Sequence, residues 1–161
     1  MNIQEIAPKI KLLLMDCDGV LTDGRLYFSE SGEAMKVFHV RDGQGIALWH
    51  KAGGVSGIIS GRGSELLKAR AAELGMKYLK APSDDKVNDL EAILADAGVL
   101  LEEVCFIGDD VGDLKIMQRV GFSVAVADAV DEVRSAASYV TNLKGGRGAV
   151  REVIDLLLTY R

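Results

Sequence analysis

The sequence predicts an α/β protein: a doubly wound, Rossmann-like, mostly parallel sheet covered by helices, with a projecting β-hairpin. Two observations predict this fold. Four short apolar segments recur along the chain, and segments with helical spacing of apolar residues lie between them. Strands buried on both faces have such apolar runs, and alternating strands and helices form parallel sheets. We expect residues 1–161 to form a single domain, because 48% of them are hydrophobic and no linker or repeat divides the chain.

The strands and helices are predicted in alternating order. The apolar runs place strands at residues 10–16, 55–60, 104–109 and 122–126. Helical spacing covers residues 45–52, 64–74, 86–97, 114–120 and 149–160. In sheets of this kind ligands bind beyond the carboxyl ends of the strands. The polar residues that follow each predicted strand are therefore the first candidates for a functional site.

The segment 25–40 departs from this alternation. Residues 25–28 and 34–40 are typical of two strands joined by the turn-rich stretch 29–33. Apolar side chains fall on both faces of this hairpin: Leu26, Tyr27, Phe28, Met35, Val37, Phe38 and Val40. Because a projecting hairpin cannot bury two apolar faces alone, we expect it to pack against another subunit.

Charge and composition exclude several classes of protein. The net charge of -5 and the lack of Lys/Arg clusters argue against a nucleic-acid partner. Residues 1–8 do not resemble a secretory signal, and no apolar run approaches the roughly 20 residues of a membrane helix. Cys17 and Cys105 lie in apolar segments, where thiols are usually buried packing groups. We therefore expect a cytoplasmic protein with no membrane partner.

Acidic residues follow two of the predicted strands. Asp16 and Asp18 come after the first strand, and the segment 108–113 supplies Asp109, Asp110 and Asp113 after the third. Alone, the first pair is typical of a turn and the second group of a capped helix start. Together at one sheet edge the carboxylates would repel each other unless a cation lay between them. The pattern predicts a Mg²⁺ site, because Mg²⁺ prefers oxygen ligands.

Two further segments favour phosphate binding. Ser60, Gly61 and Arg62 follow the second strand and are expected to open a helix, whose N-terminal N–H groups bind anions. Lys86 begins the next long helix. Taken singly, Ser60 is a helix cap and Lys86 a solvated surface residue. Their meaning depends on the motifs that accompany them.

The motifs occur in a specific order. Asp-x-Asp-Gly-x-x-Thr at 16–22, Ser60, Lys86 and Gly-Asp-Asp-x-x-Asp at 108–113 resemble the haloacid dehalogenase superfamily of phosphohydrolases. Segments 40–46, 59–62, 124–129 and 145–152 are similar to its 3-deoxy-D-manno-octulosonate 8-phosphate phosphatases, a branch without a cap domain. The resemblance implies a Mg²⁺-dependent phosphatase acting on this sugar-acid phosphate in lipopolysaccharide precursor synthesis. It also implies a homotetramer assembled through hairpins like 25–40.

The resemblance assigns a role to each candidate residue. Asp16 would be the nucleophile, and Asp18 the acid–base group that protonates the leaving oxygen and then activates water. Mg²⁺ would be bound by Asp16, by the side chain of Asp109 and by the main-chain oxygen of Asp18, with support from Asp110 and Asp113. Ser60, Gly61 and Lys86 would bind the phosphoryl group. Arg62, and Arg70 eight residues further along the same predicted helix, would bind the substrate carboxylate. Positioning and charge neutralisation are what phosphoryl transfer requires of a protein.

Three alternatives remain open. The substrate could instead be a nine-carbon sialic-type acid 9-phosphate or another sugar phosphate, although Arg62 favours the eight-carbon acid, because phosphatases for nine-carbon acids have an acidic residue there. A receiver domain shares several residue types, but its phosphorylated Asp follows a later strand than its acid pair. An inactive assembly module would have no chemical need for Asp16, Asp18, Lys86 and Asp109.

Overall fold

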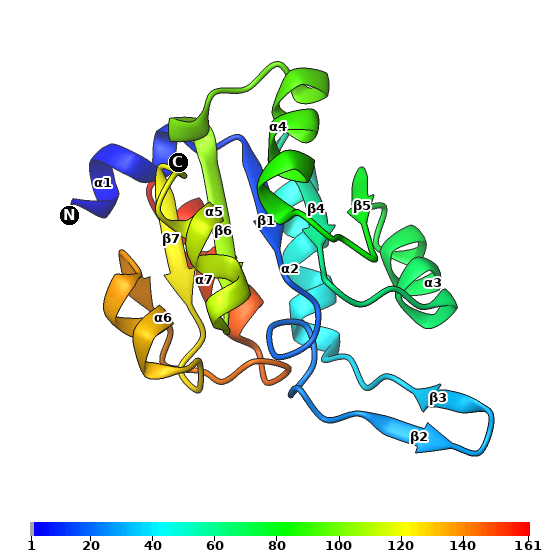
Figure 1. Cartoon of the computed structure of the whole chain (residues 1–161). Coiled ribbons are helices and arrows are strands. Elements are labelled where there is room, and N and C mark those ends of the chain that lie inside the picture. The colour runs from blue at the N-terminus through cyan, green and yellow to red at the C-terminus, as the bar shows by residue number, and fades with distance from the viewer. Residues whose placement is uncertain (1) are drawn as a thin grey trace.

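The computed structural model describes residues 2–161 and confirms the predicted α/β fold. Six parallel strands form the central sheet in the order β5-β4-β1-β6-β7-β8 (Figure 1). Their bounds are β1 Leu12–Met15, β4 Val55–Ile59, β5 Tyr78–Lys80, β6 Val104–Gly108, β7 Phe122–Ala125 and β8 Tyr139–Val140. The chain leaves β1 toward one edge and later returns to build the other, so β1 lies at the topological switch point.

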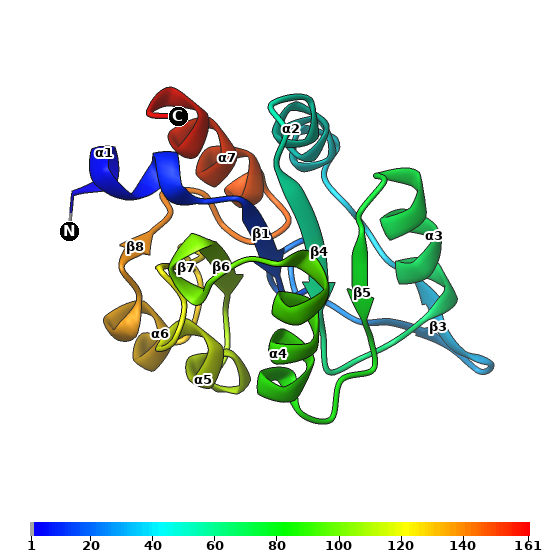
Figure 2. The ribbon, with the colours of Figure 1, turned by 90° about the horizontal axis from the view of Figure 1, so that it is seen from above.

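Helices cover both faces of the sheet. Viewed from above, α2 (Val40–Lys51) and α7 (Ala149–Thr159) lie on one face, and α4 (Lys86–Ala97), α5 (Leu114–Met117) and α6 (Asp131–Ala136) lie on the other (Figure 2). The short α1 (Ile3–Ile6) precedes β1, and α3 (Glu65–Glu73) lies beside the β5 edge. Short 3₁₀ turns span Ala7–Lys9, Leu101–Glu103 and Val111–Asp113.

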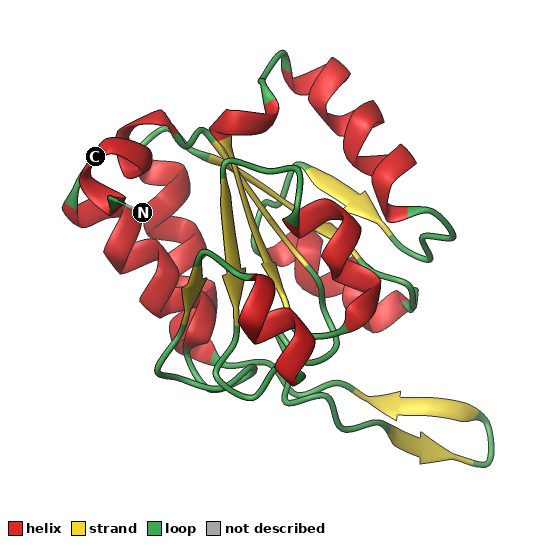
Figure 3. Cartoon of the chain, turned by 60° about the vertical axis from the view of Figure 1, so that its left-hand side comes forward, coloured by secondary structure: helices red, strands yellow, loops and turns green. Residues whose placement is uncertain are grey.

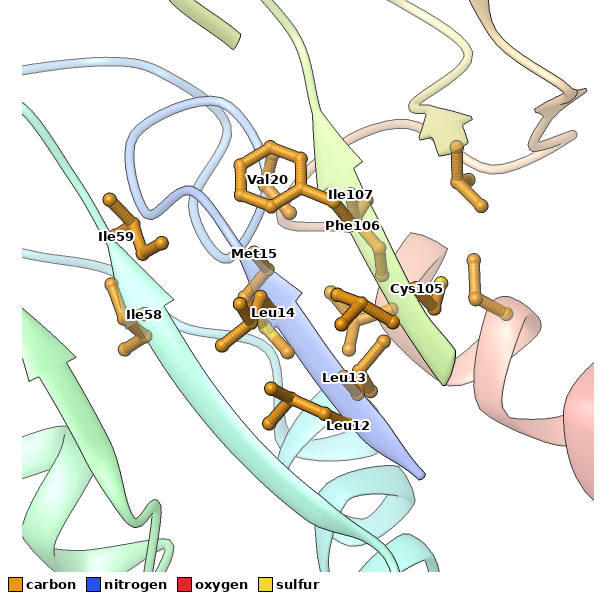
Figure 4. Close-up of a cluster of buried hydrophobic side chains, with 14 of the residues drawn as sticks. Leu12, Leu13, Leu14, Met15, Val20, Ile58, Ile59, Cys105, Phe106 and Ile107 are labelled. Carbon is orange, nitrogen blue, oxygen red and sulfur yellow. The ribbon is translucent and has the colours of Figure 1, made fainter. Parts of the chain in front are cut away.

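The core is centred on β1. All four of its residues, Leu12 to Met15, have no exposed surface, and they pack between Ile58 and Ile59 of β4 and the apolar side chains of β6 (Figure 4). A strand buried on both faces explains why this run is continuously apolar rather than alternating. The burial holds the end of β1, and with it Asp16, in a rigid place.

Some predicted boundaries were wrong. Helix α2 begins at Val40, not at residue 45, because His39 Nδ1 accepts a hydrogen bond from the N–H of Arg41 at 3.2 Å and caps the helix. The second hairpin strand therefore ends well before residue 40. The elements α1, α6, β5 and β8 were not predicted. The two missed strands have three and two residues, too few for a periodic pattern.

The predicted hairpin consists of β2 (Tyr27–Ser29) and β3 (Gly32–Met35), which pair only with each other and project from the main body (Figure 3). Phe28 is 62% exposed, and Met35 and Val37 are about half exposed. These apolar side chains are therefore uncovered within one chain. Phe38, by contrast, packs against the core.

Cys17 and Cys105 are both free and fully buried, as predicted. Between residues 2 and 161, no helix is both long enough and apolar enough to cross a membrane.

Candidate active site

Three strand ends bring the predicted residues together. Met15 of β1 lies opposite Ile58 of β4 and Ile107 of β6 in the sheet register. The N–H of Asp16 continues this pairing, donating to the Ile107 oxygen at 3.0 Å. The loops after β1, β4 and β6 therefore meet at one edge. They surround a cavity of about 260 Å³ lined by Asp16, Asp18, Ser60, Gly61, Arg62, Lys86, Asp109, Asp110, Gly112 and Asp113.

Three carboxylates converge in this cavity. Asp16, Asp109 and Asp113 each place an oxygen within 4.8 Å of the others. Asp113 is fully engaged: Oδ1 accepts from Lys86 Nζ at 2.7 Å, and Oδ2 accepts from the N–H of Asp109 at 3.0 Å. Oδ1 of Asp109 is buried without a hydrogen-bond partner among residues 2–161. Asp16 Oδ1 accepts from the N–H of Cys17 at 2.6 Å, and its Oδ2 lies 3.0 Å from Lys86 Nζ. The buried oxygen of this cluster with free capacity for a cation is therefore that of Asp109, and carboxylate oxygens are hard donors that fit Mg²⁺.

The pKa values of the cluster indicate that its negative charge is not fully compensated. Burial, the nearby Asp16 and the nearby Asp113 together raise the pKa of Asp109 to about 8. Burial and Asp113 likewise raise the pKa of Asp16 above its ordinary value. Carboxyl groups that resist ionisation in this way are stabilised as carboxylates by a bound cation.

Lys86 is the cation that the chain itself supplies. It is the first residue of α4, which Asp85 caps. Its Nζ lies 3.0 Å from Asp16 Oδ2, and its side chain is only 14% exposed. Burial alone would lower the pKa of Lys86, but Asp113 and Asp16 raise it, so the amine stays charged. Lys86 is thus a site residue and not a solvated surface lysine.

The loop after β4 differs from the prediction. Helix α3 begins at Glu65, where the hydroxyl of Ser64 accepts from the N–H of Leu67 at 3.2 Å. Ser60 and Gly61 therefore precede the helix by several residues instead of opening it. Ser60 still lines the cavity and is 1% exposed, and Arg62 lines it from the same loop.

Arg70 does not line the cavity in this chain. It lies on α3, not on one helix with Arg62 as predicted, and its guanidinium carbon lies 5.5 Å from the centre of the Phe38 ring. Its Nη1 donates to Glu73 at 2.9 Å. A Cβ at Gly43 would lie 2.7 Å from Arg70 Nη2, so this glycine of α2 makes room for the arginine. Within one chain Arg70 packs α3 against α2.

Two charged residues near Asp18, Glu33 and Lys36, were not predicted from the sequence. Lys36 Nζ lies 2.5 Å from Asp18 Oδ1 and 3.1 Å from Glu33 Oε1. Both residues belong to the hairpin segment and lie more than ten positions after Asp18. No local pattern predicts this contact, because it depends on how the hairpin folds back over the loop after β1.

Glycines allow two loops to approach the acidic cluster. Gly19 has a φ of 92°, and a Cβ there would overlap the Asp109 carboxylate. A Cβ at Gly145 would overlap the main-chain oxygen of Gly19, and the N–H of Gly146 donates to the Val20 oxygen at 2.9 Å. The Gly-Gly-Arg-Gly segment therefore supports the loop that carries Asp18.

Comparisons with known proteins indicate the family of the chain. Residues 68–154, just over half of the chain, match the haloacid dehalogenase-like hydrolase model. The chain is 46% identical over 157 residues to the 3-deoxy-D-manno-octulosonate 8-phosphate phosphatase KdsC of Yersinia pestis, covering 98% of this chain and 84% of that protein. It is 44% identical to the Escherichia coli strain B protein of the same name over the same shares.

Solved structures resemble the whole described fold. The Yersinia pestis phosphatase has a TM-score of 0.96 at 44% identity, covering 98% of this chain and 85% of that one. The Moraxella catarrhalis phosphatase, solved with magnesium, phosphate and 3-deoxy-D-manno-octulosonate (KDO), has a TM-score of 0.95 at 37% identity over 99% of this chain and 91% of that one. The chain therefore belongs to the 3-deoxy-D-manno-octulosonate 8-phosphate phosphatase family of haloacid dehalogenase-like hydrolases.

Proposed function

We propose that this chain hydrolyses 3-deoxy-D-manno-octulosonate 8-phosphate to the free sugar acid and inorganic phosphate. The observation that carries the proposal is the convergence of Asp16, Asp18, Ser60, Lys86 and Asp109 in one cavity. Relatives that bear this activity in their names match nearly the whole chain. The Moraxella catarrhalis relative was solved with the sugar acid and phosphate, the two products of this reaction.

In the proposed reaction, an oxygen of Asp16 attacks phosphorus while the bond from phosphorus to the sugar oxygen breaks. Asp18 gives a proton to the departing sugar oxygen, and the products of this step are an aspartyl phosphate and the free sugar acid. Asp18 then takes a proton from water, and the water oxygen attacks phosphorus. The bond from phosphorus to Asp16 breaks, which releases inorganic phosphate and returns Asp16 as a carboxylate. A carboxylate nucleophile divides hydrolysis into two easier displacements. Lys86 and Ser60 hold the phosphoryl oxygens and reduce charge repulsion during both steps.

We propose that Asp16, Asp109 and the main-chain oxygen of Asp18 hold Mg²⁺. The unpartnered Oδ1 of Asp109 supports this choice, and Asp16 places an oxygen within 4.8 Å of a carboxylate oxygen of Asp109. Asp113, and with it Asp110, then orients the ligand loop. When bound, the ion neutralises phosphoryl charge as a Lewis acid.

For substrate selection, we propose that Arg62 binds the sugar-acid carboxylate. Its side chain is 45% exposed and borders the cavity, so it can reach a ligand. A guanidinium pairs with a carboxylate through two parallel hydrogen bonds. The alternative substrate is a nine-carbon sugar acid 9-phosphate. We assign no substrate contact to Arg70 within one chain, because it packs between α2 and α3.

A phosphate-release assay over a panel of sugar phosphates tests this proposal. We expect 3-deoxy-D-manno-octulosonate 8-phosphate to have the highest kcat/KM. Asp16→Asn and Asp18→Asn should each lose nearly all turnover while staying folded, because an amide keeps the shape of the carboxyl group. Arg62→Ala should reduce transition-state stabilisation for the sugar-acid phosphate by about 1–3 kcal/mol. The loss should be much smaller for a sugar phosphate that has no carboxylate. Near-normal turnover by Asp16→Asn would refute the mechanism.

We also propose that the enzyme is a cytoplasmic homotetramer assembled through the hairpin 25–40. The exposed Phe28, Met35 and Val37 support the assembly, and the two free, buried thiols agree with a reducing compartment. The double variant Met35→Ser, Val37→Ser should sediment as smaller species than the wild-type assembly in sedimentation velocity. Val130→Ser, at a 41% exposed position outside the hairpin, is the control. A wild-type monomer with full activity would contradict the assembly.

A further inference from the structure

Four charged side chains form a closed ring between the hairpin and the active site. Lys36 lies 2.5 Å from Asp18 Oδ1 and 3.1 Å from Glu33 Oε1. Arg62 completes the ring, with Nε 3.3 Å from Asp18 Oδ2 and Nη2 3.5 Å from Glu33 Oε1. The hairpin segment supplies Glu33 and Lys36, and the loops after β1 and β4 supply the other two. Positive and negative groups alternate, so the ring has no net charge.

The members of the ring differ in burial. The Lys36 side chain is 3% exposed, whereas that of Arg62 is 45% exposed. A buried ammonium group is costly unless it is paired. Lys36 can therefore keep this position only while Asp18 and Glu33 remain its partners. Arg62 has room to exchange partners, but Lys36 does not.

The two oxygens of Asp18 consequently have different surroundings. Oδ1 accepts a hydrogen bond from the buried Lys36 amine. Oδ2 has no hydrogen-bond partner among residues 2–161, and its charged neighbour is the half-exposed Arg62. Lys36 thus holds one oxygen of the carboxyl group, and the buried Oδ2 keeps its hydrogen-bonding capacity.

We propose that Lys36 is a positioning residue for the reaction: it holds Asp18 by Oδ1 and aims Oδ2 at the leaving oxygen. This inference rests on the acid–base role of Asp18 in the proposed function. It makes proton transfer depend on the hairpin, since Lys36 follows β3 directly. If Lys36 only fastened the hairpin to the body, its loss would affect every substrate equally.

Leaving groups of different basicity separate these two roles. The ratio kcat/KM reports the steps up to formation of the aspartyl phosphate. A sugar alkoxide needs a proton in order to leave, whereas p-nitrophenolate does not. Lys36→Met should lower kcat/KM for the sugar phosphate by about 10- to 100-fold, because it misplaces the general acid but does not remove it, and complete general acid catalysis contributes about 100- to 10,000-fold. The loss for p-nitrophenyl phosphate should be less than about threefold.

Three further variants control for charge and folding. Lys36→Arg should recover most of the lost activity on the sugar phosphate, because it restores a cation beside Oδ1. The double variant Lys36→Met with Glu33→Gln keeps the ring neutral, and should still show the selective loss. Lys68→Met removes a lysine that is paired with Glu65 at 2.6 Å outside the ring, and should leave both substrates unaffected. Thermal melting establishes that each variant is folded.

An equal loss on both substrates, in the single and the double variant, would overturn the positioning role. So would a failure of Lys36→Arg to rescue the sugar phosphate. If Lys36→Met does not fold, the double variant and Lys36→Arg decide the question. A wild-type enzyme that rejects the octulosonate phosphate but hydrolyses another alkyl phosphate would refute the proposed substrate, and the same comparison would then use that alkyl phosphate.

Discussion

Magnesium binding should weaken steeply as the pH falls below 8. The reason is the Asp109 carboxyl group, whose pKa is raised to about 8 by burial and by the neighbouring Asp16 and Asp113. A proton and a cation compete for the same oxygen atoms, so ion binding at neutral pH must displace the proton. The raised pKa of Asp16 acts in the same direction.

The size of the effect follows from this pKa. With one competing proton, the apparent Kd for Mg²⁺ should exceed its high-pH limit about 100-fold at pH 6, about tenfold at pH 7 and about twofold at pH 8. The same group destabilises the ion-free protein as the pH rises from about 4 toward 8, because the unfolded chain holds this proton much less tightly. The increase in Tm on adding Mg²⁺ should therefore be larger at pH 8 than at pH 6.

Isothermal titration calorimetry from pH 6 to 9, in two buffers with different ionisation enthalpies, measures both the affinity and the protons released. Asp109→Asn should bind Mg²⁺ weakly and lose most of the pH dependence. Asp96→Asn, which removes a carboxylate that is 64% exposed and lies outside the cluster, should retain the wild-type profile. An affinity that stays constant between pH 6 and 9 would refute the placement of the ion at Asp109.

Three further predictions concern individual residues. Lys86→Met should reduce kcat about 100-fold or more, as loss of a preorganised charge does, yet bind Mg²⁺ at least as tightly in the same calorimetric assay. Gly145→Ala should lower both stability, by about 1–3 kcal/mol, and phosphate release, because its methyl group would overlap the Gly19 main chain. Asp42 is 1% exposed and accepts from the N–H of Arg151 at 2.9 Å, so Asp42→Ala should cost about 1–3 kcal/mol in urea unfolding with little change in kcat/KM.

The sequence by itself determined the four inner strands of the central sheet and the acidic residues that follow two of them. The strand β1 is buried on both faces, so its run of apolar residues ends abruptly where the chain reaches Asp16. The same change from apolar to acidic residues marks the end of β6 before Asp109. Because parallel strands end at a common edge, these local patterns were enough to predict that their carboxylates meet.

Only the tertiary structure decided how the peripheral segments join the site. Three features depend on contacts between residues distant in the sequence. Lys36 contacts Asp18, Gly145 packs on Gly19, and Arg70 contacts Phe38 instead of lining the cavity. Periodicity and capping patterns describe what a segment does with its own neighbours. They contain no information on which side a hairpin folds back, and that direction determines the environment of Asp18.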